Sequence, residues 1–560
     1  MRRVIQNSIE NCVGCNRCVR ACPIGEANVA HLKDGKVLVR ADHRKCIACG
    51  ACIPVCHHGS RAFEDDTARF FDDLRSGVAI SLITAPSFKQ SFDNWDKILG
   101  WFRSLHIGAI YDGQLGADIY LWAQIRHLQR NGPVPMILNP CPAIVSYILM
   151  HKSQLRKFLS PVHSPMGCTA VYMRKYENVK TKIATLSPCI AKTHEYDDTK
   201  LVNYNITFKG LVDYMAENRI QMTGEVGAFD GLGTEFGSVF PATGGLKESL
   251  EYYLGKEYSI ITSEGQTKAY KDLENYANKS EEKLPVFFNV MNCPDGCNKG
   301  IGCKPDSRSV FEISHAIHES RTRALQEESG RLLDDIFTNF DNNLQPQVFY
   351  RRFSSKPAKR IKVTPEQVEQ AFIALNKPDD TLRHFDCGAC GCNTCLEMAR
   401  KIAKNIDTPI NCLQKVLDDS RNSTASNSSY IDSILESIEL IKSTSSGIVS
   451  GIDDINELFD IYNKLITEIE KISLSVNMIS LNAAIEAAGA DVHKGAFSVV
   501  ADEIRKLAAS SSDSAIKTRD QSAGVASTIR QINELVAEIS VRINEAHENI
   551  LTIQRKTKRD

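Results

Sequence analysis

The 560-residue sequence predicts a multidomain chain with a small α+β domain, an α/β domain, a second small domain and an all-α antiparallel coiled-coil hairpin. Three observations predict this order. The 19 cysteines fall into separate groups, and none lies in residues 413–560. Apolar runs alternate with helical patterns in the second quarter of the chain, and apolar heptads fill its last quarter. The expected domains are 1–65, 75–355, 356–415 and 425–560.

The composition excludes several classes of protein. Lys and Arg number 67 and Asp and Glu number 68, and this balance argues against a bulk binder of nucleic acid or of membrane surfaces. The first residues contain no apolar signal-peptide core, and no run of about 18 apolar residues predicts a membrane-spanning helix. We therefore expect a cytoplasmic protein, in which thiols stay reduced and clustered cysteines serve metal or redox chemistry.

The first eight cysteines form two groups with C-x2-C-x2-C-x3-C spacing, as in a two-cluster bacterial ferredoxin. In that arrangement three thiolates from one group and one from the other hold each 4Fe-4S cubane. Zinc is the alternative, and the doubled spacing favours iron–sulfur. A hairpin with a turn at Asp34–Gly35 is expected between the groups. The expected ligand sets are Cys12, Cys15, Cys18 and Cys56, and Cys22, Cys46, Cys49 and Cys52.

Four apolar runs within 75–355 are typical of buried strands that end at loops. Helical patterns such as ADIYLWAQIRHLQR lie between them. Such α/β sheets place their sites at the carboxyl ends of strands, where Cys141, Cys189 and Cys293 lie, with Cys297 four residues further on. Each cysteine alone could equally be an inert buried thiol. The four runs are SGVAISLITAP, GPVPMILNPC, TKIATLSPC and KLPVFFNVMNC.

Three stretches resemble the signature motifs of iron-only (FeFe) hydrogenases, and the likeness covers about residues 1–415. The family motif T-S-C-C-P corresponds to LNPCP at 138–142, and M-P-C-x-x-K-x-x-E corresponds to SPCIAKTHE at 187–195. The motif E-x-M-x-C-x-G-G-C-x-x-G-x-G corresponds to NVMNCPDGCNKGIG at 289–302. Shorter matches are TAPSF at 84–88, LGAD at 115–118, SP at 164–165, ATGG at 242–245 and RTRAL at 321–325.

The resemblance implies that the α/β domain holds an H-cluster, at which H2 is exchanged with protons and electrons. Cys297 would bridge the 4Fe-4S cubane to a two-iron subcluster with CO, cyanide and azadithiolate, whose amine would act as the base. Lys192 would hydrogen-bond one cyanide, while Ala85, Pro86 and Ser87 would line the other. The alternative for Lys192 is an ordinary surface lysine. The cubane ligands would be Cys141, Cys189, Cys293 and Cys297.

Several positions depart from the proton path of the family. Pro140 replaces a relay cysteine, a relay glutamate appears as Ala123, and Ser187 replaces a methionine. Ser160 matches a relay serine but is expected to lack partners. Because proton transfer needs a titratable group within hydrogen-bond reach, we expect slow H2 turnover. Cys168 is a candidate alternative proton group, and a plain buried thiol is the other interpretation.

Residues 380–412 contain C-x2-C-x4-C-x16-C spacing, which resembles a small one-cluster iron–sulfur domain found in several redox proteins. The helix CLEMARKIAKNI would pack over a 4Fe-4S cluster, and zinc is the alternative. Cys303 and Cys392 match no ligand position and are expected to be structural. The expected ligands are Cys387, Cys390, Cys395 and Cys412.

Sustained heptads predict that the last domain is a coiled coil, and a structural dimerisation stalk is the plain interpretation. Its centre, from NMISLNAAIEAAG onward, resembles the tip of methyl-accepting chemotaxis proteins, with a turn near Ala490–Val492 and arms roughly 100 Å long. Such hairpins pair, so we expect a homodimer. The family tip binds a histidine kinase and its coupling protein, and Gly489, Val492 and Gly495 depart from that tip.

Three hypotheses follow. The favoured one is a sensor that passes H2 binding or redox state through the hairpin to a histidine kinase or another effector. Chain order places the Cys387–Cys412 cluster between the H-cluster and the hairpin. The second hypothesis is a working hydrogenase that exchanges electrons with ferredoxin. The third is a non-hydrogenase iron–sulfur protein without the two-iron group.

Overall fold

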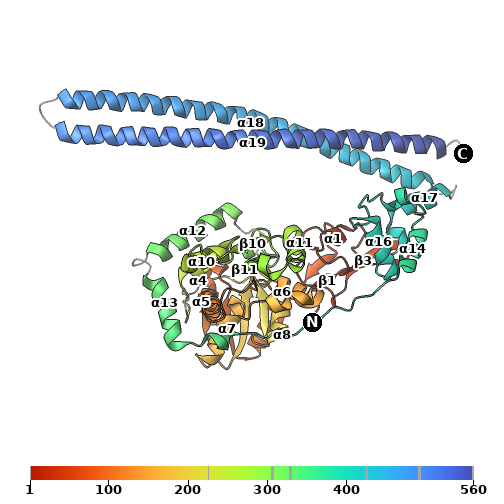
Figure 1. The fold of residues 1–560 in the computed structure, drawn as a ribbon, viewed down its shortest axis with the longest axis horizontal. Coiled ribbons are helices and arrows are strands. Elements are labelled where there is room, and N and C mark those ends of the chain that lie inside the picture. The colour runs from red at the N-terminus through yellow and green to blue at the C-terminus, as the bar shows by residue number, and fades with distance from the viewer. Residues whose placement is uncertain are drawn as a thin grey trace. The chain divides into compact units, whose positions relative to one another are not determined.

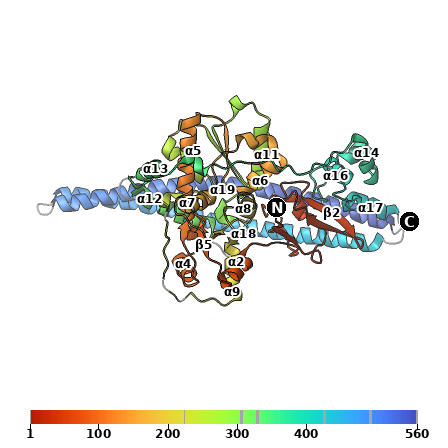
Figure 2. The same cartoon turned by 90° about the horizontal axis from the view of Figure 1, so that it is seen from below.

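The computed structural model describes residues 2–222, 224, 226–231, 233–303, 308–326, 331–422, 427–489 and 494–557. The chain divides into two compact units, Met1–Lys415 and Val416–Asp560. Figures 1 and 2 show the elements of both units.

The first unit begins with two small antiparallel sheets. Strand β1 (Ile5–Asn7) pairs with β4 (Arg61–Phe63), and β2 (Asn28–Lys33) pairs with β3 (Lys36–Ala41). Asp34 and Gly35 join β2 to β3 with φ angles of 50° and 74°. Positive φ at both positions is typical of a type I′ turn, so the expected hairpin is present. The short helix α1 (Arg17–Arg20) lies within the first cysteine group.

The α/β part contains two parallel sheets, and all four expected strands are present in them. Every residue of β5 and β11 is buried, as parallel strands covered on both faces require. The first sheet has the order β6 (Ile110–Asp112), β5 (Ile80–Thr84), β8 (Lys182–Ser187) and β9 (Tyr204–Thr207). The second has the order β10 (Ile260–Glu264), β11 (Phe287–Met291) and β7 (Met136–Leu138).

Helices surround these sheets, and most of α5 is buried among them. Its residues 113–125 are all buried, which explains a segment that is apolar on most faces. A Cβ at Gly116 would lie 2.0 Å from the carbonyl oxygen of Pro165, so glycine lets α5 approach α7 closely. The helices are α2 (Thr67–Arg75), α3 (Phe88–Ser91), α4 (Trp95–Ser104), α5 (Gly113–Asn131), α6 (Pro142–His151), α7 (Pro165–Lys175), α8 (Lys192–Thr199), α9 (Phe208–Glu217), α10 (Gly245–Leu254), α11 (Gln266–Ala277), α12 (Val310–Gln326) and α13 (Arg331–Asn343).

The first 65 residues share a hydrophobic core with the α/β part. Ile24 and Ile47 pack in one cluster with Ile144, Ile148 and Tyr270. The imidazole Nε2 of His151 also lies 2.8 Å from the carbonyl oxygen of Lys45. The N-terminal sheets and the α/β part are therefore packed as one body.

The small domain at the end of the first unit contains α14 (Pro365–Ala374), α15 (Asp380–Arg383) and α16 (Cys395–Ala403). Thr364 and Gln367 form a capping box that starts α14. Phe372 and Met398 pack against the cysteines of this domain. The expected helix over the cysteines is therefore α16.

The second unit is a helical hairpin, preceded by α17 (Leu413–Asn422). Its arms, α18 (Asn427–Gly489) and α19 (Lys494–Thr557), have 63 and 64 residues and run side by side (Figure 1). The expected turn at Ala490–Val492 lies outside the described residues. Among the described helices, none is both long and apolar enough to span a lipid bilayer.

In each arm, one of the two apolar positions of the heptad is buried inside the hairpin, and the second apolar position is exposed to solvent. The buried positions recur every seven residues; they are Ile438, Ser445, Ile452, Ile466, Ser473 and Ser480 in α18, and Ala501, Ala508, Ala515, Ser522, Ile529 and Val536 in α19. The intervening positions are 41–47 % exposed; they are Ile448, Ile455, Tyr462, Ile469, Val525, Ile532 and Ile539. A single hairpin therefore buries only part of its apolar heptads.

Candidate functional site

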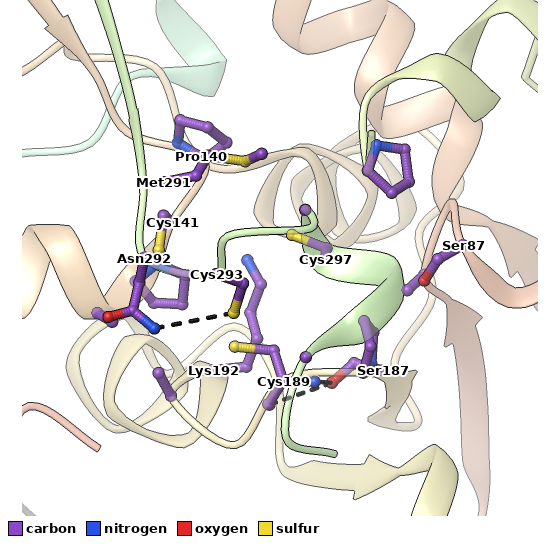
Figure 3. Close-up of a pocket in the computed structure, with 18 of the residues that line it drawn as sticks. Ser87, Pro140, Cys141, Ser187, Cys189, Lys192, Met291, Asn292, Cys293 and Cys297 are labelled. Carbon is purple, nitrogen blue, oxygen red and sulfur yellow. Dashed lines mark hydrogen bonds between the residues drawn. The ribbon is translucent and has the colours of Figure 1, made fainter. Parts of the chain in front are cut away.

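The carboxyl ends of strands from both parallel sheets meet at one pocket (Figure 3). The four cysteines expected to hold the H-cluster cubane all line it; they are Cys141, Cys189, Cys293 and Cys297. The other lining residues are mostly apolar, and they include Pro86, Met166 and Phe240. The cavity between these side chains has a volume of about 90 Å³.

Glycines of the third motif allow the loop that carries Cys297 to close over the pocket. Gly296 has φ of 70°, and a Cβ there would lie 2.2 Å from the carbonyl oxygen of Pro241. A Cβ at Gly300 would lie 2.6 Å from the carbonyl oxygen of Pro188, next to Cys189. Larger residues at these positions would separate the two cysteine loops.

The pocket thiols are buried, which affects their chemistry. Burial raises the pKa of Cys189 to about 11, and it also raises the pKa of Cys141. The amide of Asn292 is 3.8 Å from Cys293 Sγ (Figure 3), and backbone N–H groups approach the sulfurs of Cys141 and Cys189. Bare thiols here stay protonated, whereas a metal cluster stabilises thiolates in the same place. The donor set fits a 4Fe-4S cubane.

Lys192 lines the pocket and is only 7 % exposed, so the surface-lysine interpretation is wrong. Its Nζ donates hydrogen bonds to Ser164 Oγ at 2.8 Å and to Glu195 Oε2 at 2.7 Å. Burial favours the neutral form of Glu195, but the charges of Lys192 and Arg351 hold its pKa below its usual range. Arg351 in turn pairs with Asp198 at 2.6 Å. A buried network of charges therefore fixes the Lys192 ammonium at the pocket.

Ser87 and Pro86 follow strand β5 and line the pocket, and Figure 3 shows Ser87 at its edge. The Ser87 hydroxyl is buried and has no hydrogen-bond partner among the described residues. An unsatisfied buried hydroxyl is costly, and a ligand atom that accepts a hydrogen bond would satisfy it. Ser187, by contrast, donates to Asn205 at 2.9 Å. Ser87 therefore fits a polar ligand in the pocket.

The structure corrects one part of the expected proton path. Pro140 lines the pocket and carries no proton. Ser160 is not without a partner, because the side-chain amide of Gln124 donates to its hydroxyl. The residue that faces Ser160 is therefore Gln124 and not Ala123, one position earlier on α5. An amide does not titrate, so no acid–base group occupies this position.

Cys168 is fully buried on α7, and its thiol donates to the carbonyl oxygen of His163 at 3.3 Å. Burial raises its pKa well above the usual value. Met166, two residues earlier on α7, lines the pocket, and the role of Cys168 as a proton group stays a prediction. The thiol of Cys303 donates to the carbonyl oxygen of Asn298 at 3.1 Å.

The structure brings together the two expected ligand sets of the N-terminal domain. A common cavity is lined by Cys12, Cys15, Cys18 and Cys56. Cys49 interacts electrostatically with Cys22, Cys46 and Cys52. Cys49 also lines the pocket of the H-cluster cysteines, so the second set lies next to that pocket.

The small domain surrounds its own cavity, which the expected ligands Cys387, Cys390, Cys395 and Cys412 all line. Cys392 also lines this cavity and accepts a hydrogen bond from Lys401 Nζ at 3.4 Å. The spacing of the cysteines in the sequence did not predict that Cys392 lines this cavity. Among the described residues, no three His, Cys, Asp or Glu side chains converge closely enough for a single metal ion.

Comparisons with known families cover most of the chain. Residues 78–301 match the iron-only hydrogenase large subunit, C-terminal domain. Residues 11–60 match a 4Fe-4S dicluster domain, and residues 382–414 match a family of Fe-S cluster domains. Residues 422–559 match the methyl-accepting chemotaxis protein signalling domain.

Individual relatives cover much less of the chain, and the chain spans less than a fifth of the length of the curated relatives it matches. A sensory transducer protein of Acetivibrio thermocellus is 31 % identical over 98 residues, which are 18 % of each chain. The methyl-accepting chemotaxis protein McpB of Bacillus subtilis is 32 % identical over 114 residues, which are 20 % of this chain and 15 % of that one. A solved FeFe-hydrogenase variant from Chlamydomonas reinhardtii is 16 % identical over 50 % of this chain and 95 % of that one, with a TM-score of 0.37.

The family matches and the geometry agree on the kind of protein. An iron-only hydrogenase domain is joined to two iron–sulfur domains and to a chemotaxis-type signalling domain in one chain. The chain is therefore a hydrogenase-like iron–sulfur protein fused to a signalling module.

Proposed function

We propose that the chain senses H2 or redox state at an H-cluster and passes that state to a signalling partner through its hairpin. One observation carries this proposal. The pocket combines four convergent thiols with a buried ammonium and an unpartnered hydroxyl, and the same chain ends in a signalling domain.

The pocket residues have separate roles in this proposal. The cubane would be held by Cys141, Cys189, Cys293 and Cys297, and Cys297 would also bridge to the two-iron subcluster. When bound, that subcluster with its CO, cyanide and azadithiolate would supply the H2-splitting chemistry. Lys192 would donate to one of its ligands, and Ser87 would donate to another. The apolar wall, including Pro86 and Met166, would exclude water.

The other cysteine sets would hold three further 4Fe-4S clusters: two in the N-terminal domain and one in the small domain. The family matches for both domains and the cysteines that line each cavity support this assignment. These clusters would carry electrons to or from the pocket, and a ferredoxin is a suitable external donor or acceptor.

Slow turnover follows from the residues beside the pocket. Pro140 and Gln124 occupy the positions where a proton relay would need titratable groups. Protons would therefore reach the pocket slowly. A sensor tolerates this, because it needs occupancy of the site and not flux through it.

The signalling output would require a homodimer. Seven heptad side chains remain 41–47 % exposed on one hairpin, and a second hairpin would bury them in a four-helix bundle. The partner at the tip would be a histidine kinase or another effector. No nucleic-acid or membrane partner is proposed.

Infrared spectroscopy of the matured full-length chain, under H2 and then under argon, tests the proposed function. We expect CO and cyanide bands that differ between the two gases, together with slow H2 turnover. Lys192→Met should shift the cyanide bands, because it removes the donor, whereas Lys200→Met on the exposed end of α8 should not.

The other outcomes separate the alternatives. The absence of CO and cyanide bands after maturation would identify a non-hydrogenase iron–sulfur protein. Turnover that rivals fast hydrogenases would identify a catalytic enzyme that exchanges electrons with ferredoxin.

A further inference from the structure

The small domain docks on the N-terminal iron–sulfur domain, although chain order places it after the α/β domain. In Figures 1 and 2, α16 lies beside the N-terminal strands and α1. A Cβ at Gly391 would lie 3.0 Å from Val19 Cβ and 3.1 Å from Asn16 Cβ. The amide of Ala30 donates to the carbonyl oxygen of Ile406 at 3.0 Å. The loop that carries Cys390 therefore touches the loop between Cys15 and Cys18.

A buried pair of amides joins the two domains at their cysteine loops. Asn16 Nδ2 donates to Asn411 Oδ1 at 2.6 Å, and Asn411 Nδ2 is 3.4 Å from Asn16 Oδ1. Both side chains are buried. Asn16 follows Cys15 and Asn411 precedes Cys412, so one hydrogen-bonded step connects two cysteine ligand positions. Buried amides are costly unless they are paired, so this contact is specific.

Charged side chains surround the same interface. Lys404 on the small domain pairs with Glu26, which also accepts a hydrogen bond from Lys45 at 2.8 Å. Lys401 is only 4 % exposed; its Nζ lies 3.2 Å from Glu397 and 3.4 Å from Cys392 Sγ. A Cβ at Gly25, three residues after Cys22, would lie 3.9 Å from Lys401 Cε. A fixed positive charge therefore lies close to cysteines of both domains.

The opposite side of the N-terminal domain faces the pocket. Cys49 lines the pocket together with the H-cluster cysteines. Tyr270, which is buried, packs in one hydrophobic cluster with Cys141 and Cys49. The N-terminal domain thus contacts the pocket with one ligand set and contacts the small domain beside its other set.

We propose that the interface around Asn16, Asn411 and Lys401 is an electron-transfer junction between the N-terminal domain and the small domain. Electrons would pass from the pocket through the N-terminal clusters to the small domain, which chain order alone would place directly after the pocket. This inference deepens the proposed sensor function, since it names the route by which redox state leaves the hydrogenase domain.

The transfer step moves one electron and breaks no bond. A reduced cluster in the N-terminal domain is oxidised, and the oxidised cluster in the small domain is reduced. No proton is required, because the Lys401 ammonium already offsets the added negative charge. The electron comes from H2 under the proposed function, or from dithionite in the experiment below.

The experiment uses the full chain reconstituted with iron and sulfide, without the two-iron subcluster, and reduced with dithionite. Electron paramagnetic resonance should show that the signal of the small-domain cluster is broadened by a neighbouring reduced cluster. The double substitution Lys404→Glu and Asn411→Leu should abolish this broadening, because it removes the ion pair and the amide pair. The matched control, Arg400→Glu on the exposed face of α16, should keep it. Iron content should be equal in all three proteins.

Two results would overturn the junction. One is a fully loaded native chain without broadening, and the other is unchanged broadening in the double variant. A redox titration gives a second test that does not require the domains to separate. Lys401→Met should lower the midpoint potential of the small-domain cluster, whereas Lys401→Arg should restore it. An unchanged potential in Lys401→Met would remove Lys401 from the junction.

This design separates the two proposals. If infrared bands from CO and cyanide are absent while the broadening is present, the sensor function fails and the junction stands. If the bands respond to H2 while the broadening is absent, the junction fails and the sensor function stands.

Discussion

The pocket of the α/β domain and the hairpin of the second unit leave opposite kinds of groups unsatisfied. In the pocket, the buried hydroxyl of Ser87 has no described partner, while the surrounding apolar side chains are well covered. In the hairpin, buried Ser473 is paired with Ser511, while apolar residues such as Ile455 and Ile532 remain 46 % and 41 % exposed.

The difference indicates what each region lacks. A small polar ligand could satisfy an unpaired hydroxyl inside a pocket. Only another apolar surface of similar length could cover a stripe of exposed heptad residues. Under the proposed function, the first unit would hold a small group and the second unit would pair with another chain. All three tryptophans, Trp95, Trp101 and Trp122, lie in the first unit. Tryptophan fluorescence therefore reports on the first unit, and the hairpin needs a different measurement.

The largest effect is expected from Glu195→Gln. The substitution removes the carboxylate that pairs with Lys192 at 2.7 Å and leaves a buried ammonium uncompensated. Breaking a buried ion pair in this way costs about 3–5 kcal/mol. Urea unfolding followed by tryptophan fluorescence should show this loss in the first unit, and Glu217→Gln on the exposed end of α9 is the control. A loss below about 1 kcal/mol would contradict a tightly fixed Lys192.

The pH dependence of the first unit should follow its buried histidines. Burial lowers the pKa of His194 to about 4, and it lowers the pKa of His163 to about 4 as well. Unfolded histidines take up protons near pH 6.5. The unfolded state therefore binds more protons between pH 6.5 and 4, and the unfolding free energy falls as pH falls through this window.

His194→Phe measures the contribution of His194 to this pH dependence. Without the protonation of His194, the unfolding free energy should fall by about 2–3 kcal/mol less between pH 7 and pH 4.5, because one pKa unit corresponds to about 1.4 kcal/mol. The readout is the fluorescence-detected unfolding free energy at the two pH values. An identical pH dependence in the variant would show that His194 is protonated in the folded protein.

Dimerisation of the hairpin should weaken when an exposed apolar residue is removed, and it should not change when an exposed charged residue is removed. Ile532→Ala removes an apolar side chain from each chain of the proposed dimer, and sedimentation equilibrium should show dimer dissociation about tenfold or more easier. Glu534→Ala, two residues away and exposed, should leave association unchanged. Tryptophan fluorescence of the first unit should be the same in both variants. Equal association for Ile532→Ala and the native chain would contradict the four-helix bundle.

The sequence predicts local features of both regions well. The four buried strands β5, β7, β8 and β11 and the turn at Asp34–Gly35 follow from apolar runs and turn residues within a few positions. The equal arms of the hairpin follow from the heptads. The grouping of Cys56 with the first three cysteines follows from a spacing that has one known arrangement.

The missed features depend on contacts between distant parts of the chain. The expectation that Ser160 lacks a partner is wrong, because the turn of α5 brings the side-chain amide of Gln124 to its hydroxyl. The contact of Asn16 with Asn411 joins residues almost 400 positions apart, and neither has a local signal. Cys168 follows the matched SP pair, and its thiol donates to the backbone carbonyl of His163, a contact that the sequence does not predict.

The smallest expected effect concerns the serine pair inside the hairpin. Ser473 is 4 % exposed and donates to Ser511 Oγ at 2.9 Å, whereas Ser511 is exposed to solvent. Ser473→Ala leaves a hydroxyl that water can satisfy, so it should cost only a few tenths of a kcal/mol. Ser511→Ala leaves the buried hydroxyl of Ser473 without this acceptor, so it should cost more, about 1 kcal/mol.

The order of these two costs is the informative quantity, and thermal unfolding followed by far-ultraviolet circular dichroism measures it. The double variant should be less destabilised than the sum of the two single variants, because the unpaired hydroxyl is then absent. Equal costs would indicate that water reaches Ser473 in the assembled bundle. The pair would then set the register of the two arms without protecting a buried polar group.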